Sequence, residues 1–148
     1  MKRAVVTELD HVITYQVYRA SRLLRFFLQK RLKINKAHLS PEQFFILLRL
    51  YMKDGQTQRD LADPILNDHP NITRMLDKLE KIGYVQRKND VRDRRSFIIT
   101  LSAKGRAICE SSLQPIQEER KKILKGITKE EIKLAQNIIK TVEANLMK

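Results

Sequence analysis

A cluster of charged side chains near the middle of the chain raises the first question about chemistry. Residues 89–100 read NDVRDRRSFIIT, with three arginines and two aspartates in positions 90–95 and an apolar run directly after them. The segment could be an ordinary solvated hairpin tip. It could also contact a polyanion, because guanidinium groups bind phosphate well. The elements around it distinguish these two interpretations.

A second set of polar side chains precedes this cluster, on a predicted helix. The apolar residues of that helix have the spacing of a single face: Ile72, Met75, Leu76, Leu79 and Ile82. The opposite face carries His69, Pro70, Asn71, Thr73, Arg74, Asp77 and Lys78. Asn and Arg can contact the edges of adenine and guanine in two places, and Lys suits a phosphate. This face is therefore either simply solvated or a surface for DNA.

Charge favours a polyanionic partner. The net charge is +13, and it is concentrated in residues 1–38, with nine Lys/Arg against two Asp/Glu, and in residues 71–106, with ten against four. Strong positive charge raises the rate of encounter with nucleic acid. An anionic membrane is the second partner class, and a general excess of surface lysine is the plain alternative.

Composition bounds the class of protein. A chain of 148 residues with 42% hydrophobic residues can form one domain with a packed core. No apolar run has the length of a membrane span, and the first residues lack the pattern of a signal peptide. The single cysteine, Cys109, cannot form an internal disulfide. We therefore expect a cytoplasmic protein. Because no phosphate-binding glycine loop, nucleophile motif or metal-ligand spacing is present, we expect neither an enzyme nor a cofactor.

Helix-capping signals order the central elements. A helix is predicted to begin at Ser40-Pro41 and to end near Gly55, and a short one follows Thr57, with Asp60 completing the cap. Asn67 or Asp68 caps the polar-faced helix, which Gly83 ends. Tyr84–Lys88 and Ser96–Leu101 are predicted strands, so that the charged cluster forms the tip of a β-hairpin. Further helices are predicted from Ser102, with a bend near Pro115, and from Thr128, with Glu131 completing its cap.

Helices at both ends of the chain carry more apolar residues than a small domain can cover. The first, about residues 8–32, has apolar side chains on too wide an arc for one stripe. The last is predicted to bury Ile132, Leu134, Ala135, Ile138, Ile139, Val142 and Leu146. A partner subunit could supply the missing cover. The fold predicted is mainly α with a small β-hairpin wing, a winged helix-turn-helix domain plus N- and C-terminal dimerisation helices.

Residues 39–105 resemble the MarR (multiple antibiotic resistance regulator) family of bacterial transcription regulators. The similarity lies in Thr73-Arg74, in Leu76-Asp77-Lys78-Leu79-Glu80-Lys81-x-Gly83, in Asp90-x-Arg92-Asp93-Arg94-Arg95, and in Leu101-Ser102-x-Lys104-Gly105. The resemblance implies a homodimer, with residues 1–38 and 106–148 in dimerisation and residues 39–105 in DNA binding. It also implies a repressor on a palindromic operator, released by a small phenolic or aromatic effector.

The resemblance also assigns roles to single residues. DNA contacts are expected from His69, Pro70, Asn71, Thr73, Arg74, Lys78, Arg92, Arg94 and Arg95. Arg94 is the first candidate for insertion into the minor groove. Asp90 and Asp93 are expected to shape the wing, with Arg95 as the structural partner of Asp93.

Some features depart from the family pattern. Leu66 stands where the turn between the two helices usually has Gly, and Pro64 precedes it. The reactive cysteine of the oxidation-sensing branch is absent from the first helix, and Cys109 is expected to be a small buried hydrophobe. His11, His38 and His69 are isolated in sequence, which gives no support for a metal sensor. The alternative function is a winged helix that binds RNA or protein without an operator, since fold alone does not exclude it.

Overall fold

The structure, a computed structural model, describes residues 9–34, 38–62 and 69–148. The chain divides after Gln114 into two compact units, 1–114 and 115–148. In chain order the elements are α2 (Ile13–Ile34), α3 (Pro41–Met52), β1 (Gln56–Thr57), α4 (Gln58–Leu61), α5 (His69–Lys81), β2 (Val85–Asn89), β3 (Phe97–Leu101), α6 (Ala103–Ile123) and α7 (Lys129–Leu146). The predicted cap of α5 at Asn67 or Asp68, the turn at Pro64 and Leu66, and the start of the first helix at Glu8 lie outside the described residues.

Three helices begin at the capping residues that the sequence predicts. Ser40 caps α3, Thr57 caps α4 and Thr128 caps α7, and each forms a reciprocal capping box with the third residue of its helix. In each box, the side chain of the capping residue and that of the third helical residue each accept a hydrogen bond from the other residue's backbone N–H. These amides have no partner within the helix. The predicted starts of these helices are confirmed.

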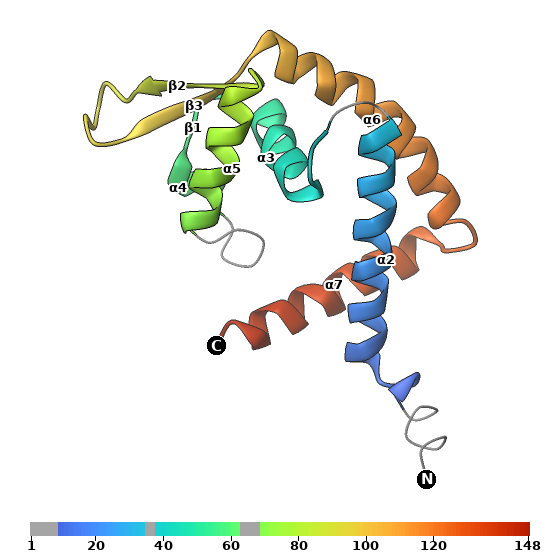
Figure 1. Cartoon of the computed structure of the whole chain (residues 1–148). Coiled ribbons are helices and arrows are strands. Elements are labelled where there is room, and N and C mark those ends of the chain that lie inside the picture. The colour runs from blue at the N-terminus through green and yellow to red at the C-terminus, as the bar shows by residue number, and fades with distance from the viewer. Residues whose placement is uncertain (1–8, 35–37, 63–68) are drawn as a thin grey trace. The chain divides into compact units, whose positions relative to one another are not determined.

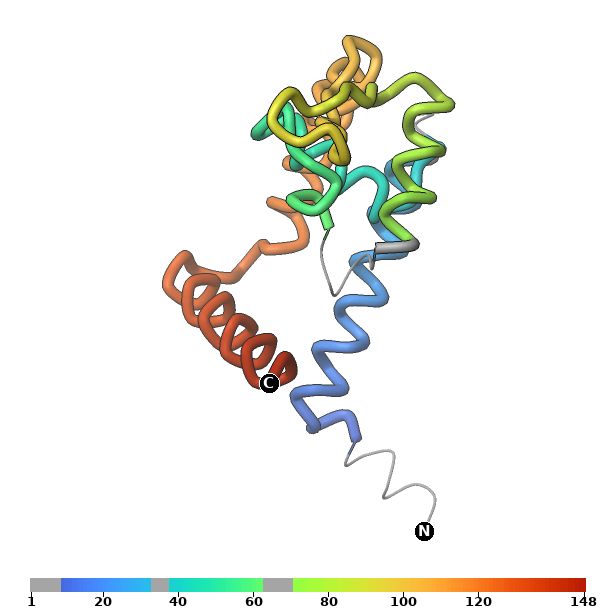
Figure 2. The backbone as a smooth tube through the Cα atoms, turned by 90° about the vertical axis from the view of Figure 1, so that its left-hand side faces the viewer, coloured from blue at the N-terminus to red at the C-terminus, as the bar shows by residue number. Residues whose placement is uncertain are grey.

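The hydrophobic core of the first unit lies between the helix-turn-helix and the sheet. Its fully buried side chains come from α2 (Leu32), α3 (Phe44, Ile46, Leu47, Leu50), α4 (Leu61), α5 (Ile72, Leu76, Leu79), the sheet (Val85, Ile99) and α6 (Cys109). Figure 1 shows α3, α4 and α5 grouped beside the root of the hairpin, while β2 and β3 extend beyond them. In Figure 2 the same hairpin is viewed from the side of its tip.

The sheet has one more strand than the sequence predicts. β3 is its central strand, paired antiparallel with β2 from Val85–Leu101 to Asn89–Phe97, and paired on its other side with the two-residue β1. The prediction of only two strands was therefore wrong, because a strand of two residues gives no detectable alternation. Strand β2 is displaced by one residue from the predicted Tyr84–Lys88, whereas β3 starts one residue later than the predicted Ser96–Leu101 and ends at Leu101 as predicted.

The two glycines that flank the hairpin have different roles. Gly83 has φ +81°, a left-handed conformation that ends α5 as predicted. Gly105 instead lies inside the first turn of α6, the helix predicted to start from Ser102. A Cβ at Gly105 would lie 2.1 Å from the carbonyl oxygen of Tyr84. No larger side chain fits there, so the position requires glycine.

The second unit buries little of its apolar surface within one chain. No residue of α7 is buried in the protomer, and Leu134, Ile138, Ile139 and Leu146 are exposed. The prediction that α7 buries these side chains is therefore wrong for the isolated chain. Pro115 lies inside α6, which continues to Ile123. In the described ranges no helix has the length and apolarity needed to cross a membrane.

Candidate nucleic-acid interface

Helix α5 separates a buried face from an exposed polar face. Ile72, Leu76 and Leu79 have no exposed surface. The exposed side chains are Thr73, Arg74, Asp77 and Lys78, while Asn71 is half-buried. His69 and Pro70 occupy the first two positions of the helix. The predicted apolar stripe of α5 is confirmed, and Thr73, Arg74, Asp77 and Lys78 lie on the side of the helix that the core leaves uncovered.

Helix α4 holds one of these residues directly. The side-chain amide of Gln58 donates a hydrogen bond of 2.6 Å to the hydroxyl of Thr73. Gln58 is the first residue of α4, whose start is fixed by the Thr57–Asp60 capping box. The bond therefore fixes the rotation of the Thr73 side chain from the neighbouring helix. Gln58 was not among the predicted site residues, although its place directly after a cap could have indicated it.

Arg87 joins α5 to the hairpin. Its guanidinium forms ion pairs of 2.7 Å with both Asp77 and Glu80, and its backbone N–H donates to Glu80 at 3.2 Å. The Arg87 side chain is 17% exposed. Partial burial lowers the pKa of Arg87, but the hydrogen bonds and charges of the two carboxylates outweigh burial and raise it above its ordinary value. Sequence reasoning missed this residue, since an arginine in a strand carries no signal of its partners.

The wing tip is shaped by two aspartates that bond to nearby backbone. The Asp90 carboxylate accepts the backbone N–H of Arg92, and that of Asp93 accepts the backbone N–H of Arg95, both at 2.9 Å. The contact between Asp93 and Arg95 thus involves the amide of Arg95. The side chains of Arg92, Arg94 and Arg95 are exposed and make no ion pair with any described residue. Three positive groups are therefore displayed on a defined turn.

The segment after β3 fastens the root of the hairpin to the rest of the unit. The Ser102 hydroxyl donates to the carbonyl of Gly83 at 2.6 Å, and the Lys104 ammonium donates to the carbonyl of Ile82 at 2.8 Å. Both bonds satisfy carbonyls at the end of α5. The Asp54 carboxylate accepts the Leu101 N–H at 2.8 Å, which holds β3 beside the end of α3. Each polar residue of the Ser102-x-Lys104 motif thus bonds to the end of α5.

Comparison with known proteins identifies this arrangement. The family model described as MarR matches residues 39–97. The HTH-type transcriptional regulator BilQ of Clostridium symbiosum is 30% identical over 118 residues, which span 77% of this chain and 82% of the relative. The chain belongs to the MarR family. The predicted family is confirmed, and the protein is a MarR-family transcription regulator.

Solved structures share the MarR fold over most of their length. The S. aureus MepR–DNA complex has a TM-score of 0.80 at 22% identity, covering 93% of this chain and 98% of that one. A MarR protein from Peptoclostridium difficile has a TM-score of 0.78 at 23% identity, covering 90% and 86%. Reduced AbfR bound to DNA has a TM-score of 0.75 at 24% identity and covers both chains fully. These likenesses confirm the predicted winged helix-turn-helix fold.

Cys109 belongs to α6 and is not part of this MarR-type surface. Cys109 is fully buried, and burial raises the pKa of its thiol to about 11. At neutral pH the thiol is therefore protonated almost entirely, and the thiolate is the reactive form. In the part of the chain that the structure describes, no three His, Cys, Asp or Glu side chains are grouped to hold a metal ion.

Proposed function

We propose that this MarR-family protein is a homodimeric repressor that binds a palindromic operator in double-stranded DNA, and that it has no enzymatic activity. The observation that carries this proposal is the exposed face of α5 next to three exposed wing arginines. A helix of this kind fits the major groove, where base edges are distinguishable. We assign base contacts to Asn71, Thr73 and Arg74, a phosphate contact to Lys78, and contacts at the helix start to His69 and Pro70.

The wing is proposed to contact the adjacent minor groove. Arg94 is the first candidate for insertion, with Arg92 and Arg95 as further DNA contacts. Narrow A·T-rich minor grooves have enhanced negative potential, so an arginine there recognises groove shape more than base identity. Asp90 and Asp93 support this role because their carboxylates bond to the backbone of the turn. Operator binding would place the protein in the cytoplasm with the DNA.

Dimerisation is proposed from the uncovered apolar faces of α2 and α7. On α2 the exposed apolar side chains include Val17, Leu23, Leu24 and Phe26, and α7 buries no residue in one protomer. Contiguous apolar surfaces of this kind are typical of protein interfaces. We assign residues 1–38 and 106–148 to dimerisation and residues 39–105 to DNA binding. The protein should sediment as a dimer at micromolar concentration, and a stable monomer would contradict the assignment.

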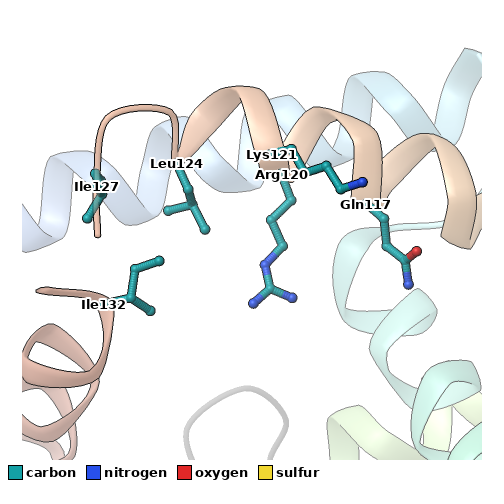
Figure 3. Close-up of a pocket in the computed structure, with 6 residues that line it drawn as sticks. All are labelled: Gln117, Arg120, Lys121, Leu124, Ile127 and Ile132. Atoms are coloured by element: carbon teal, nitrogen blue, oxygen red, sulfur yellow. The ribbon is translucent and has the colours of Figure 1, made fainter. Parts of the chain in front are cut away.

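Release by a small phenolic or aromatic effector is the second half of the proposal. A hollow of about 340 Å³ within residues 115–148 is lined by Leu124, Ile127 and Ile132, with Gln117, Arg120 and Lys121 at its polar side. Figure 3 shows the side chains of Gln117 and Arg120 directed into it from α6, and that of Leu124 from the turn directly after α6. An apolar wall with a cation beside it suits an aromatic ring bearing a carboxylate or phenolate.

The hollow can be tested with 4-hydroxybenzoate as a probe. This compound should release DNA from the wild-type protein, and Arg120→Ala should weaken the release while leaving DNA affinity and dimerisation unchanged. Dissociation of the dimer by Arg120→Ala would instead assign the hollow to the interface between protomers.

Selection of duplexes from a random DNA pool by the purified protein tests operator binding. An inverted repeat with half-sites about 10 base pairs apart is expected from two recognition helices related by two-fold symmetry. Recovery of sites without such symmetry would contradict the dimeric arrangement. Failure to enrich any duplex, with RNA or a protein bound instead, would favour the alternative of an interaction module.

A further inference from the structure

Two carboxylates lie on or beside the surface that we assign to DNA. Asp77 follows Thr73 by four residues and Arg74 by three, so it shares their side of α5. Its side chain is 59% exposed, and that of Glu80 is 41% exposed. A duplex carries one negative charge for about every 1.7 Å of its axis. Two unneutralised carboxylates at this position would therefore repel the phosphates that the neighbouring cations attract.

Arg87 is placed to remove this repulsion. It approaches both carboxylates from β2 with N···O distances of 2.7 Å. The side chain of Arg87 is the most covered partner of the bridge, whereas the two acids are largely exposed. The protein thus holds the guanidinium of Arg87 in place, and the carboxylates of Asp77 and Glu80 are turned toward it from the edge of the exposed face of α5. The hydrogen bond from the backbone N–H of Arg87 to the Glu80 carboxylate also holds β2 against α5.

We propose that Arg87 is a positioning residue for DNA binding, which neutralises Asp77 and Glu80 and holds them away from the phosphates while it sets α5 against the wing. This inference rests on the proposed binding of DNA. It assigns to Arg87 no contact with DNA itself. Arg87 instead acts through two acids, whose charges become harmful to binding when the bridge is broken.

The test compares four proteins on the duplex recovered by selection and on a scrambled duplex of equal length. They are the wild type, Arg87→Met, Asp77→Asn with Glu80→Gln, and the triple variant that combines all three changes. Arg87→Met should weaken binding by about tenfold or more, because it leaves two carboxylates unpaired beside DNA. The triple variant should recover most of that loss, and the variant lacking only the acids should bind at least as tightly as the wild type.

The dependence of DNA binding on salt distinguishes an electrostatic role of Arg87 from a purely structural one. Repulsion between exposed charges is screened, so the deficit of Arg87→Met should shrink as salt rises from about 50 to about 200 mM. A structural defect would give a deficit independent of salt and would persist in the triple variant. Either result would overturn the proposal, as would unchanged affinity in Arg87→Met. If Arg87→Met does not fold, weaker binding by the variant lacking only the acids would overturn it.

A matched control uses another bridge between two elements of the first unit. Arg25 of α2 bonds to Glu42 of α3 at 2.9 Å and lies outside the proposed surface. Arg25→Met removes the same charge and should lower affinity much less than Arg87→Met. Absence of DNA binding by the wild type would count against the proposed function itself, whereas binding by the wild type without rescue in the triple variant would count against the role of Arg87 alone.

Discussion

The two parts of the proposed DNA surface, α5 and the wing tip, are held by different kinds of interaction. Helix α5 is fixed by long-range packing and by bonds from other elements: its apolar side is fully buried, Gln58 bonds to Thr73, and Arg87 bonds to two of its acids. The tip is held by local bonds between residues two to six apart. The two parts should therefore respond differently to mutation, since changes at the buried side of α5 affect folding as well as DNA affinity and changes at the tip affect DNA affinity alone.

The largest effect should follow from opening a cavity under α5. Leu76 is completely buried, so Leu76→Ala should lower the free energy of unfolding by about 2–5 kcal/mol. DNA affinity should fall with it, because the exposed face loses its support. Thermal denaturation followed by circular dichroism measures the loss. An unchanged melting temperature would contradict the account of α5 as held by packing.

Arg94→Ala should reverse that pattern. It removes an exposed guanidinium from the tip, so affinity for the selected duplex should fall about tenfold to 100-fold while the melting temperature stays unchanged. Arg19→Ala on α2 is the matched control for the loss of one positive charge. Equal effects of the two substitutions in a titration at fixed salt would remove the proposed role of Arg94.

A smaller effect should follow from loosening the tip without removing a cation. Asp93→Ala deletes the acceptor of the Arg95 amide, a bond typically worth about 1 kcal/mol, so affinity should fall several-fold. Unfolding should be unaffected, since the bond joins residues within one turn. Asp93→Asn keeps an acceptor and should restore most of the affinity, and failure of this rescue would show that charge at position 93 matters instead.

The smallest effect is expected at the contact between α4 and α5. Gln58→Ala removes the exposed bond to Thr73 and should change affinity by about 0.5 kcal/mol, mostly at the base pair that Thr73 faces. Selection with this variant should therefore relax one position of each half-site. A uniform loss at every position would indicate that Gln58 contacts phosphate and does not orient Thr73.

Local signals in the sequence predicted most of the elements, and the remaining features depend on contacts between distant residues. Capping residues and helical periodicity are confirmed at Ser40, Thr57 and Thr128 and on α5, because each is set within a turn or two of one helix. The strand β1 forms only against Ile98 and Ile99, far along the chain, and its own two residues have no pattern.

The residues of the candidate site fall into the same two groups, those predicted from local sequence and those that depend on distant contacts. The polar face of α5 and the wing arginines could be named from residue types and spacing. Gln58 and Arg87 could not, since their importance comes from the partners that folding brings to them. The need for glycine at position 105 also depends on a distant contact: the backbone of Tyr84 that excludes a larger residue there is twenty-one positions away in sequence.

The order of strands in the small sheet has a consequence for solubility. Strand β2 lies at the edge, so one of its sides presents backbone amides and carbonyls that no neighbouring strand satisfies. Exposed edges of this kind invite pairing between molecules, and charged side chains discourage it. Lys88 supplies positive charge on β2, the backbone N–H of Arg87 is already bonded to Glu80, and the opposite edge, β1, is only two residues long. A hairpin that projects far enough to meet a ligand is thereby protected from aggregation.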